Sequence, residues 1–160
     1  MSIRTQGTEL YFADSVNYSN VTLVKLTCPT GISGLGGPRD QIDTTCLDVI
    51  GDKTFVAGLG NPGQVSVPFN LDPTAASHTG LFALKSNGAI LDWIACLSEG
   101  NDAPTLDTDD TIIAPTDRST IEFAGFVSDV NIDLATNEIV RGTLTIQRSG
   151  DVIFTGFTPS

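Results

Sequence analysis

Residues 64–97 read QVSVPFNLDPTAASHTGLFALKSNGAILDWIACL, and this stretch contains the changes of period that decide the fold. Gln64–Leu71 alternates between apolar and polar residues, which predicts a strand with one buried face. Asp72 offers a capping carboxylate before a proline, which predicts a helix over residues 73–86 that ends at an Asn-Gly pair. Ile90–Leu97 is apolar on both faces, as is typical of a central strand covered on two sides. The helix is expected to cover this strand with Ala75, His78, Leu81, Phe82 and Leu84.

Strands dominate the rest of the chain. Alternation predicts a strand near residues 20–26 and a short one at residues 53–57. The strand expected after residue 120 changes phase near Gly125, which indicates a β-bulge. The pattern predicts one mainly β domain over residues 1–160, a β-sandwich or barrel of about seven strands with one flanking α-helix and long loops. The last three strands are expected at residues 121–134, 138–148 and 152–157.

One long segment has no helix or strand period. Between Leu26 and Asp48 the sequence reads LTCPTGISGLGGPRDQIDTTCLD, and loops longer than about 12 to 15 residues are usually functional or disordered. Its apolar side chains are not typical of disorder, so we expect residues 27–48 to be a loop that docks on another surface. Residues 1–9 are polar and are expected to form an arm that is frayed or ordered only by a neighbour.

Composition limits the classes of function. Charged residues make up 17% of the chain and the formal net charge is −11. The eight lysines and arginines are scattered singly, so no basic stripe is available to hold DNA or RNA. A neutral polar surface loses little when it is covered, which favours self-association, although a low-charge monomer fits the composition equally well. The sequence has no apolar run typical of a signal peptide or a membrane span, and we expect synthesis in the cytoplasm.

No group of residues predicts an enzyme, a cofactor site or a metal site. Residues 58–63 satisfy G-x-G-x-x-G, but a strand pattern follows where a dinucleotide site needs a helix, so we interpret them as a glycine turn. His78 has no nucleophile partner and is expected in the core or an interface. The aspartates of residues 102–110 lack the glycine and glutamate of a calcium loop. Cys28, Cys46 and Cys96 have neither redox nor zinc spacing and are expected as buried or partly buried free thiols.

Three segments resemble the major tail tube protein of long-tailed, siphovirus-type bacteriophages. They are PFNLDPTAASHTGLFALKSNGAILDWIACLSEG (residues 68–100), FAGFVSDVNIDLATNEIVRGTLTIQRSG (residues 123–150) and the ending FTGFTPS. The resemblance implies a non-enzymatic virion protein that forms hexameric rings, stacked into a tail tube through which the genome passes. It also implies other tail proteins as partners, such as the tape measure, tail tip and terminator proteins, and no cofactor and no membrane contact. The chain stops soon after the last predicted strand, so an additional C-terminal domain is not expected.

The resemblance also gives named residues expected roles. An excess of acid would place negative potential along the bore, so that DNA slides without specific binding. The candidates for facing the bore are Asp129, Asn131, Asp133 and Gln147, for which the outer surface is an equally good position. Residues 29–45, helped by the arm, are expected to reach the adjacent ring, whereas a mobile surface insertion is the alternative. The candidates in this loop are Ile32, Leu35, Arg39, Asp40 and Ile42.

Three other functions remain as alternatives. The inner tube protein of a contractile phage tail or secretion system would share ring assembly but would lie inside a sheath. A carbohydrate-binding β-sandwich would need exposed aromatic side chains, whereas Trp93 lies in a strand that is expected to be buried. A hydrolase is the least supported, because no catalytic group is evident.

Overall fold

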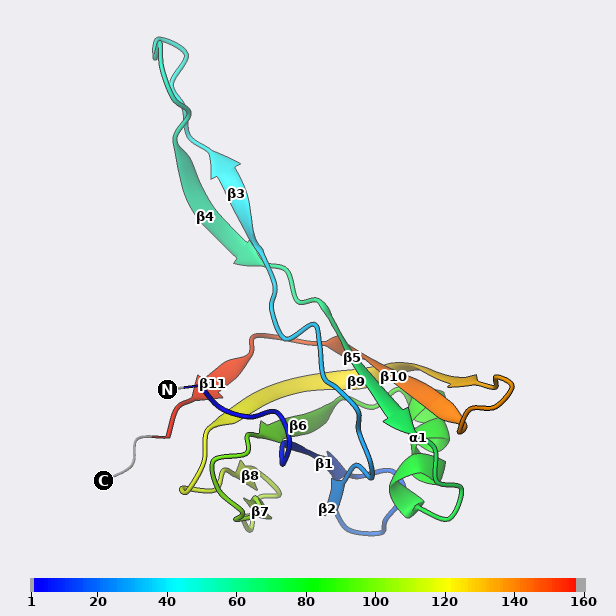
Figure 1. The fold of residues 1–160 in the computed structure, drawn as a ribbon. Helices are drawn as coiled ribbons and strands as arrows, with labels where there is room; N and C mark the ends of the chain where they lie inside the picture. Colours follow the sequence, from blue (N-terminus) through cyan, green and yellow to red (C-terminus); the bar gives the residue numbers. More distant parts are fainter. Residues whose placement is uncertain (1, 158–160) are drawn as a thin grey trace.

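The computed structural model describes residues 2–157, which form one helix and a set of antiparallel strands (Figure 1). Helix α1 spans Ala76–Asn87. The strands are β1 (Glu9–Asp14), β2 (Thr22–Lys25), β3 (Arg39–Asp43), β4 (Phe55–Gly60), β5 (Gln64–Asn70), β6 (Leu91–Cys96), β7 (Thr105–Leu106), β8 (Ile112–Ile113), β9 (Thr120–Asp133), β10 (Arg141–Arg148) and β11 (Ile153–Thr155). The predicted mainly β fold with one flanking helix is confirmed.

The main sheet has seven strands. Its order is β2-β1-β6-β9-β10-β5, and β11 continues beyond β10 along the same side of β9. The strand β9 is paired with β6 over its first half and with β10 over its second half, so it joins two groups of strands that do not otherwise pair. The strands β3 and β4 form a separate two-stranded sheet, as do β7 and β8.

The core lies between the main sheet and α1, with Trp93 of β6 at its centre. The Trp93 side chain is fully buried, and its Nε1 donates a hydrogen bond of 3.1 Å to the carbonyl oxygen of Gly125. The ring of Phe12 lies 4.8 Å from the Trp93 ring, and the ring of Phe123 is stacked with it at 6.3 Å. Five of the six side chains of β6 are buried, which confirms the prediction of a central strand.

The helix begins later than predicted. Asp72 does not cap it: its Oδ1 accepts hydrogen bonds from the backbone N–H and the hydroxyl of Thr74, so residues 72–74 form a turn and the N-cap is Ala75. The predicted end is confirmed, since Gly88 adopts the left-handed conformation with φ 71°. The buried face consists of Ser77, His78, Leu81 and Leu84, whereas Phe82 is exposed and was wrongly placed on it.

The predicted β-bulge is present but lies further along β9. The register with β10 shifts at Ser128, which has no direct partner between Val127 and Asp129. The buried positions of β9 accordingly change from Phe123, Gly125 and Val127 to Val130. Gly125 is not the site of the bulge. A glycine is needed there because a Cβ would meet the backbone oxygen of Gln147 at 2.5 Å.

Residues 27–48 are not one structureless loop. Residues 29–33 run beside β5, where they form isolated bridges between Pro29 and Phe69 and between Ser33 and Ser66. Residues 39–43 are strand β3, which pairs with β4. The glycines of residues 58–60 lie within β4 and not in a turn, so the interpretation of residues 58–63 as a turn was wrong for these positions. The irregular sequence of the segment hid both a stretch that pairs with the edge strand β5 and one strand of a hairpin.

Candidate functional site

The most prominent feature of the surface is the hairpin formed by β3 and β4, which projects away from the main sheet (Figure 1). Cross-strand partners continue beyond the two strands, since the Thr44 backbone N–H donates to the Thr54 carbonyl oxygen at 2.9 Å and the two hydroxyls lie 3.1 Å apart. Each arm between residue 39 and residue 60 contains roughly ten residues, which at about 3.3 Å per residue gives a reach of about 30 Å. The hairpin could therefore contact a molecule well outside its own domain.

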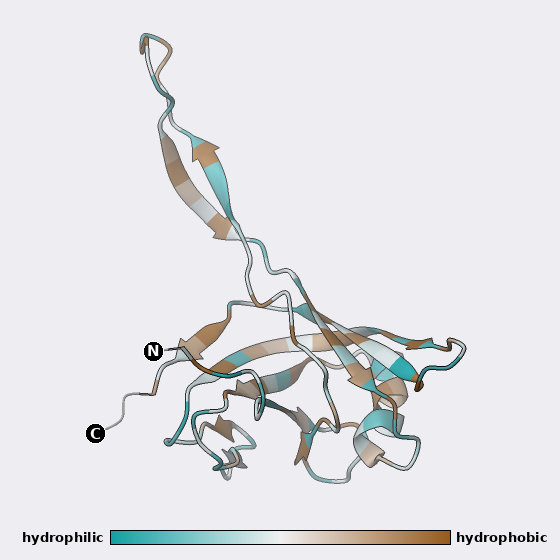
Figure 2. Cartoon of the chain, viewed as in Figure 1, coloured by the Kyte–Doolittle hydropathy of each residue, from teal (hydrophilic) through white to brown (hydrophobic). Residues whose placement is uncertain are grey.

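The hairpin exposes an unusual amount of apolar surface. Figure 2 shows hydrophobic colouring along much of β4, although β3 is its one partner among the described strands. Leu47 and Ile50, at the tip, are as exposed as in an extended chain. Contiguous exposed apolar surface usually marks an interaction site. The large apolar side chains exposed here are Ile42, Leu47, Val49, Ile50, Phe55, Val56 and Leu59.

The five residues expected in the docking loop separate into two groups. Ile32 and Leu35 are partly buried and pack against the core of their own domain, so their contacts are intramolecular. Arg39, Asp40 and Ile42 lie on β3 and are exposed, so the structure places them on the projecting hairpin. The sequence did not show that the hairpin continues to Gly60, because the pairing of β3 with β4 spans the irregular segment between them.

The four candidates for facing the bore share one face of the main sheet. Asp129, Asn131 and Asp133 are exposed on β9, on the face opposite the buried Val130. Gln147 lies on the same face of β10 but is only half-buried, and its Nε2 donates to the carbonyl oxygen of Arg148 at 3.2 Å. The structure therefore groups the first three and places Gln147 near the opposite end of β10.

Positive charges lie close to these carboxylates, a proximity for which the sequence has no signal. The Lys85 Nζ on α1 lies 3.3 Å from Asp129 Oδ1, and both side chains are largely exposed. Arg141 is directly opposite Asp133 in the register of β10 and β9. Exposed ion pairs contribute little to stability, about 0–1 kcal/mol. This face is consequently polar with mixed charge. The net negative charge around Asp129, Asn131 and Asp133 is smaller than the two carboxylates alone would give.

The N-terminal segment is tied to the domain. The Ser98 hydroxyl donates to the Arg4 carbonyl oxygen, and the Thr8 backbone N–H donates to the Thr5 carbonyl oxygen at 3.1 Å. Arg4 therefore contacts its own domain, whereas residues 2–7 are exposed, and the ordering of this arm by a neighbour stays a prediction. Met1 lies outside the described residues.

A buried ion pair fixes the start of β1. The Arg118 side chain is fully buried, and its Nη1 donates to Glu9 Oε1 at 3.1 Å, while Lys25 Nζ lies 2.7 Å from Glu9 Oε2. Burial alone would raise the pKa of Glu9, but hydrogen bonds from Lys25, Tyr11 and Arg118 lower it to about 2. The Glu9 carboxylate therefore stays ionised down to about pH 2 and neutralises the buried Arg118 guanidinium. The role of this cluster is structural.

His78 lies in the core, which is one of the two positions expected for it. Its Nδ1 accepts a hydrogen bond of 2.9 Å from the Asp72 backbone N–H, so Nε2 carries the proton and donates to the Thr27 carbonyl oxygen. The imidazole also lies 4.6 Å from the Phe69 ring. Because both ring nitrogens are occupied, His78 connects the helix to residues 26–28 and is not available as a base.

The remaining chemistry-bearing residues are dispersed. Among residues 2–157, no three His, Cys, Asp or Glu side chains come close enough together to bind a metal ion. All three cysteines are free thiols, but Cys28 and Cys46 are exposed, so only Cys96 fits the expected burial. In the part of the chain that is described, no helix is long and apolar enough to span a membrane.

Comparison with known sequences gives two matches over almost the whole chain. The sequence model of the family described as "Phage tail tube, TTP, lambda-like" matches residues 1–156. "Structural protein 3" of Pseudomonas phage PAJU2 is 34% identical over 155 residues, which cover 94% of this chain and 92% of that protein.

Solved structures with a similar fold come from several kinds of tube. The SPP1 tail tube superimposes with a TM-score of 0.64 at 9% identity, covering 99% of this chain and 81% of that one. The tail of an empty gene transfer agent particle, described with C6 symmetry, gives 0.67 at 10% identity, with 97% and 100% covered. The sheath-tube complex of the PVC extracellular contractile injection system gives 0.65 at 15% identity, with 97% and 92% covered. At these identities the likeness concerns the fold alone.

Proposed function

Since the chain belongs to the lambda-like phage tail tube family, we propose that it forms hexameric rings that stack into the tail tube and enclose a conduit for the genome. Membership of the family makes it a structural component of the virion tail. The hexameric number is supported by the C6 symmetry given for the gene transfer agent tail, which has the same fold. In a ring, each copy contacts its neighbours through the same two complementary surfaces.

The observation that supports stacking best is the exposed apolar hairpin. Its seven large apolar side chains are half to fully exposed among the described residues, and its reach of about 30 Å carries them away from their own domain. A second ring placed along the tube axis would cover them. The hairpin between residues 39 and 60, and not the whole of residues 27–48, is then the element that connects one ring to the next.

The polar face of β9 and β10 is the surface we assign to the bore. It carries small polar side chains such as Thr143 and Thr145 beside Asp129, Asn131 and Asp133. The cations Lys85 and Arg141 partly offset the carboxylates of this face. The negative potential that repels DNA therefore depends both on this face and on the net charge of −11 of each copy.

Replacing Asp129 and Asp133 with lysine tests this assignment. We expect tubes of normal length, because both side chains are exposed, together with slower genome release, because cations in the bore would hold phosphates. Ejection can be followed by fluorescence of released DNA in particles complemented with the variant. A variant with both residues changed to asparagine is the control for loss of charge alone. Release at the normal rate from the lysine variant would contradict a bore-facing position.

Removing the tip of the hairpin tests the stacking role. Residues 45–53 would be replaced by Asn-Gly, a two-residue turn suited to the cross-strand pair Thr44 and Thr54. We expect the shortened protein to fold and to form separate rings or monomers, because its domain core is untouched. Negative-stain electron microscopy and sedimentation velocity distinguish these species from tubes.

Two outcomes of this experiment would contradict the proposal. If the shortened protein forms tubes as long as those of the wild type, the hairpin is not the connection between rings. If the wild type itself remains monomeric at high concentration, even when seeded with tail tips, the tube assembly is wrong. A hairpin of full length with Asp52→Asn serves as the control for a change at the tip that leaves the apolar residues in place.

The chain is more consistent with a tube without a sheath than with one from a contractile system. The fold is shared with the PVC sheath-tube complex, but the family match is to the lambda-like tail tubes. The expected partners are accordingly the tape measure, terminator and tail tip proteins, and no enzymatic activity is proposed. Binding of a sheath protein to assembled tubes, detected by co-sedimentation, would favour the contractile alternative instead.

A further inference from the structure

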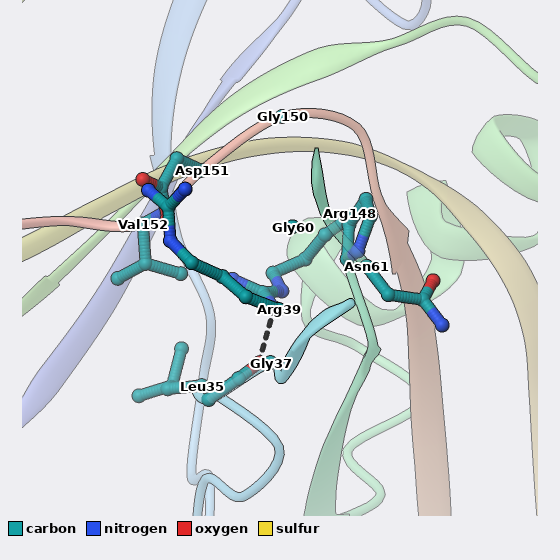
Figure 3. Close-up of a pocket in the computed structure, with 11 residues that line it drawn as sticks. Leu35, Gly37, Arg39, Gly60, Asn61, Arg148, Gly150, Asp151 and Val152 are labelled. Atoms are coloured by element: carbon teal, nitrogen blue, oxygen red, sulfur yellow. Dashed lines mark hydrogen bonds between the residues drawn. The ribbon is translucent and has the colours of Figure 1, made fainter. Parts of the chain in front are cut away.

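A positively charged pocket lies at the root of the hairpin, in a protein whose net charge is −11 (Figure 3). Its volume is about 480 Å³. Arginines from two elements contribute to it: Arg148 at the end of β10 and Arg39 at the start of β3. Glycine backbone forms much of the remaining wall, and the other residues along it are Leu35, Asn61, Pro62, Asp151 and Val152.

Arg148 is buried without a charged partner. Its residue is 4% exposed, and one nitrogen, Nη2, donates to the carbonyl oxygen of Gly36. Its Nε is buried and has no hydrogen-bond partner among the described residues, and no carboxylate of the described chain forms an ion pair with it. A buried guanidinium that lacks a carboxylate is strongly unfavourable compared with a paired one.

The other buried arginine provides an internal comparison. Arg118 is also buried with unpartnered nitrogens, but its Nη1 donates to Glu9 Oε1 at 3.1 Å. The fold thus supplies a carboxylate to one buried arginine and leaves Arg148 with backbone oxygen alone. Among residues 2–157, Arg148 is therefore the buried arginine that lacks a carboxylate partner.

The pocket is shaped by glycine. A Cβ at Gly37 would lie 2.7 Å from Arg148 Nη2 and 2.9 Å from the Asn61 carbonyl oxygen. Any larger residue there would displace the guanidinium. Figure 3 shows the Arg39 side chain extending along the opposite wall towards Asp151, whose carboxylate accepts the Val152 backbone N–H at 2.8 Å. A ligand that enters the pocket would therefore meet two guanidinium groups.

We propose that this pocket binds an aspartate or glutamate side chain of a second copy of the chain in the assembled tube. A carboxylate fits the planar, two-pronged donor geometry of arginine. Each copy carries 19 acidic residues against eight basic ones, so carboxylates are plentiful on every neighbouring surface. A carboxylate delivered by assembly is held in place by the other contacts between copies, whereas a free anion would have to overcome the negative field alone.

The position of the pocket links this contact to the hairpin, and the inference rests on the tube assembly proposed above. Arg39 Nη1 also donates to the Gly58 carbonyl oxygen at 3.4 Å across the hairpin. Arg39 and Arg148 therefore join the hairpin, residues 36–37 and the main sheet at one place. Binding of a neighbouring carboxylate there would fix the direction in which the hairpin projects.

Zero-length cross-linking of Arg39→Lys provides the direct test. The introduced amine condenses with a nearby carboxylate, with loss of water, when tubes are treated with a carbodiimide. Tubes are assembled from a mixture of ¹⁴N- and ¹⁵N-labelled copies, so that mass spectrometry separates links within one copy from links between copies. We expect a link between copies from position 39 to one acidic residue, absent in unassembled protein.

A second measurement uses Arg148→Met, which keeps most of the volume and removes the charge. We expect the concentration needed for tube formation to rise at least about tenfold, and Arg148→Lys to recover part of the loss. Arg141→Met is the matched control, because it makes the same change at the exposed, opposite end of β10. Circular dichroism of unassembled protein verifies that each variant is folded.

The outcomes separate this inference from the tube assembly itself. If wild-type tubes form but the only link from position 39 is to Asp151 of the same copy, the pocket does not receive a neighbouring carboxylate. Equal assembly of folded Arg148→Met and wild type would overturn the inference in the same way. If Arg148→Met does not fold, the cross-linking result decides. Failure of the wild type to assemble would refute the tube assembly and not the pocket alone.

Discussion

The tip of the hairpin allows a sharp prediction, because Leu47 and Ile50 are 105% and 103% exposed. Replacing both with serine removes no contact within the monomer, so the free energy of unfolding should change by less than about 0.5 kcal/mol. If an adjacent ring buries them, each contributes about 1.5–3 kcal/mol, or about 3–6 kcal/mol for the pair. A difference of about 1.4 kcal/mol changes an equilibrium constant tenfold, so the concentration needed for tube formation should rise by at least about a hundredfold.

The assay is sedimentation of assembled tubes over a dilution series, with light scattering as a second measure. The matched control is Leu47→Met with Ile50→Leu, which keeps the apolar area and should assemble near the wild-type concentration. Assembly of the double serine variant at that same concentration would refute the reasoning, because the two most exposed apolar side chains would then be uncovered in the tube as well.

Two further predictions concern the folded domain. Glu9→Gln leaves the buried Arg118 without its carboxylate and should cost about 3 kcal/mol in urea unfolding at pH 7. Because the pKa of Glu9 is about 2 against an ordinary value of 4.5, this stabilisation is complete above pH 4.5, and wild type and variant should converge as the pH falls towards 2. Gly142→Ala places a Cβ 2.5 Å from the buried ring of Phe69 and should lower the unfolding free energy by about 1–3 kcal/mol. Gly51→Ala meets no atom within 4 Å and should leave it unchanged.

The sequence predicted elements whose period was local and regular. Strand β6 and the end of α1 could be read directly, because burial on both faces and an Asn-Gly stop each act within a few residues. The start of α1 was wrong because the Asp72 carboxylate has two possible local partners, and in the structure it binds Thr74. Propensity alone cannot choose between a cap and a turn that use the same side chain.

Elements that depend on distant partners were harder to predict. Strand β1 was not predicted, although Leu10–Ala13 is an apolar run, because a short apolar run alone does not distinguish a strand from a helix. Only part of the hairpin was predicted from the sequence. The strands β3 and β4 are separated by residues 44–54, which have no alternating pattern, so their pairing had no local signal. The pocket at Arg148 had no sequence signal, because Gly36 and Arg148 are brought together only by the folded sheet.

The arrangement of strands around β9 has a consequence for the order of events in the cell. Before β10 is synthesised, β5 can form only the isolated bridges to residues 29–33, and β6 is joined to β10 through β9, which is also made late. The apolar hairpin leaves the ribosome well before either, while the domain that carries it is still unfolded. A nascent chain therefore offers its neighbours no finished ring surface until nearly the whole polypeptide has been translated, which delays polymerisation until each subunit is complete.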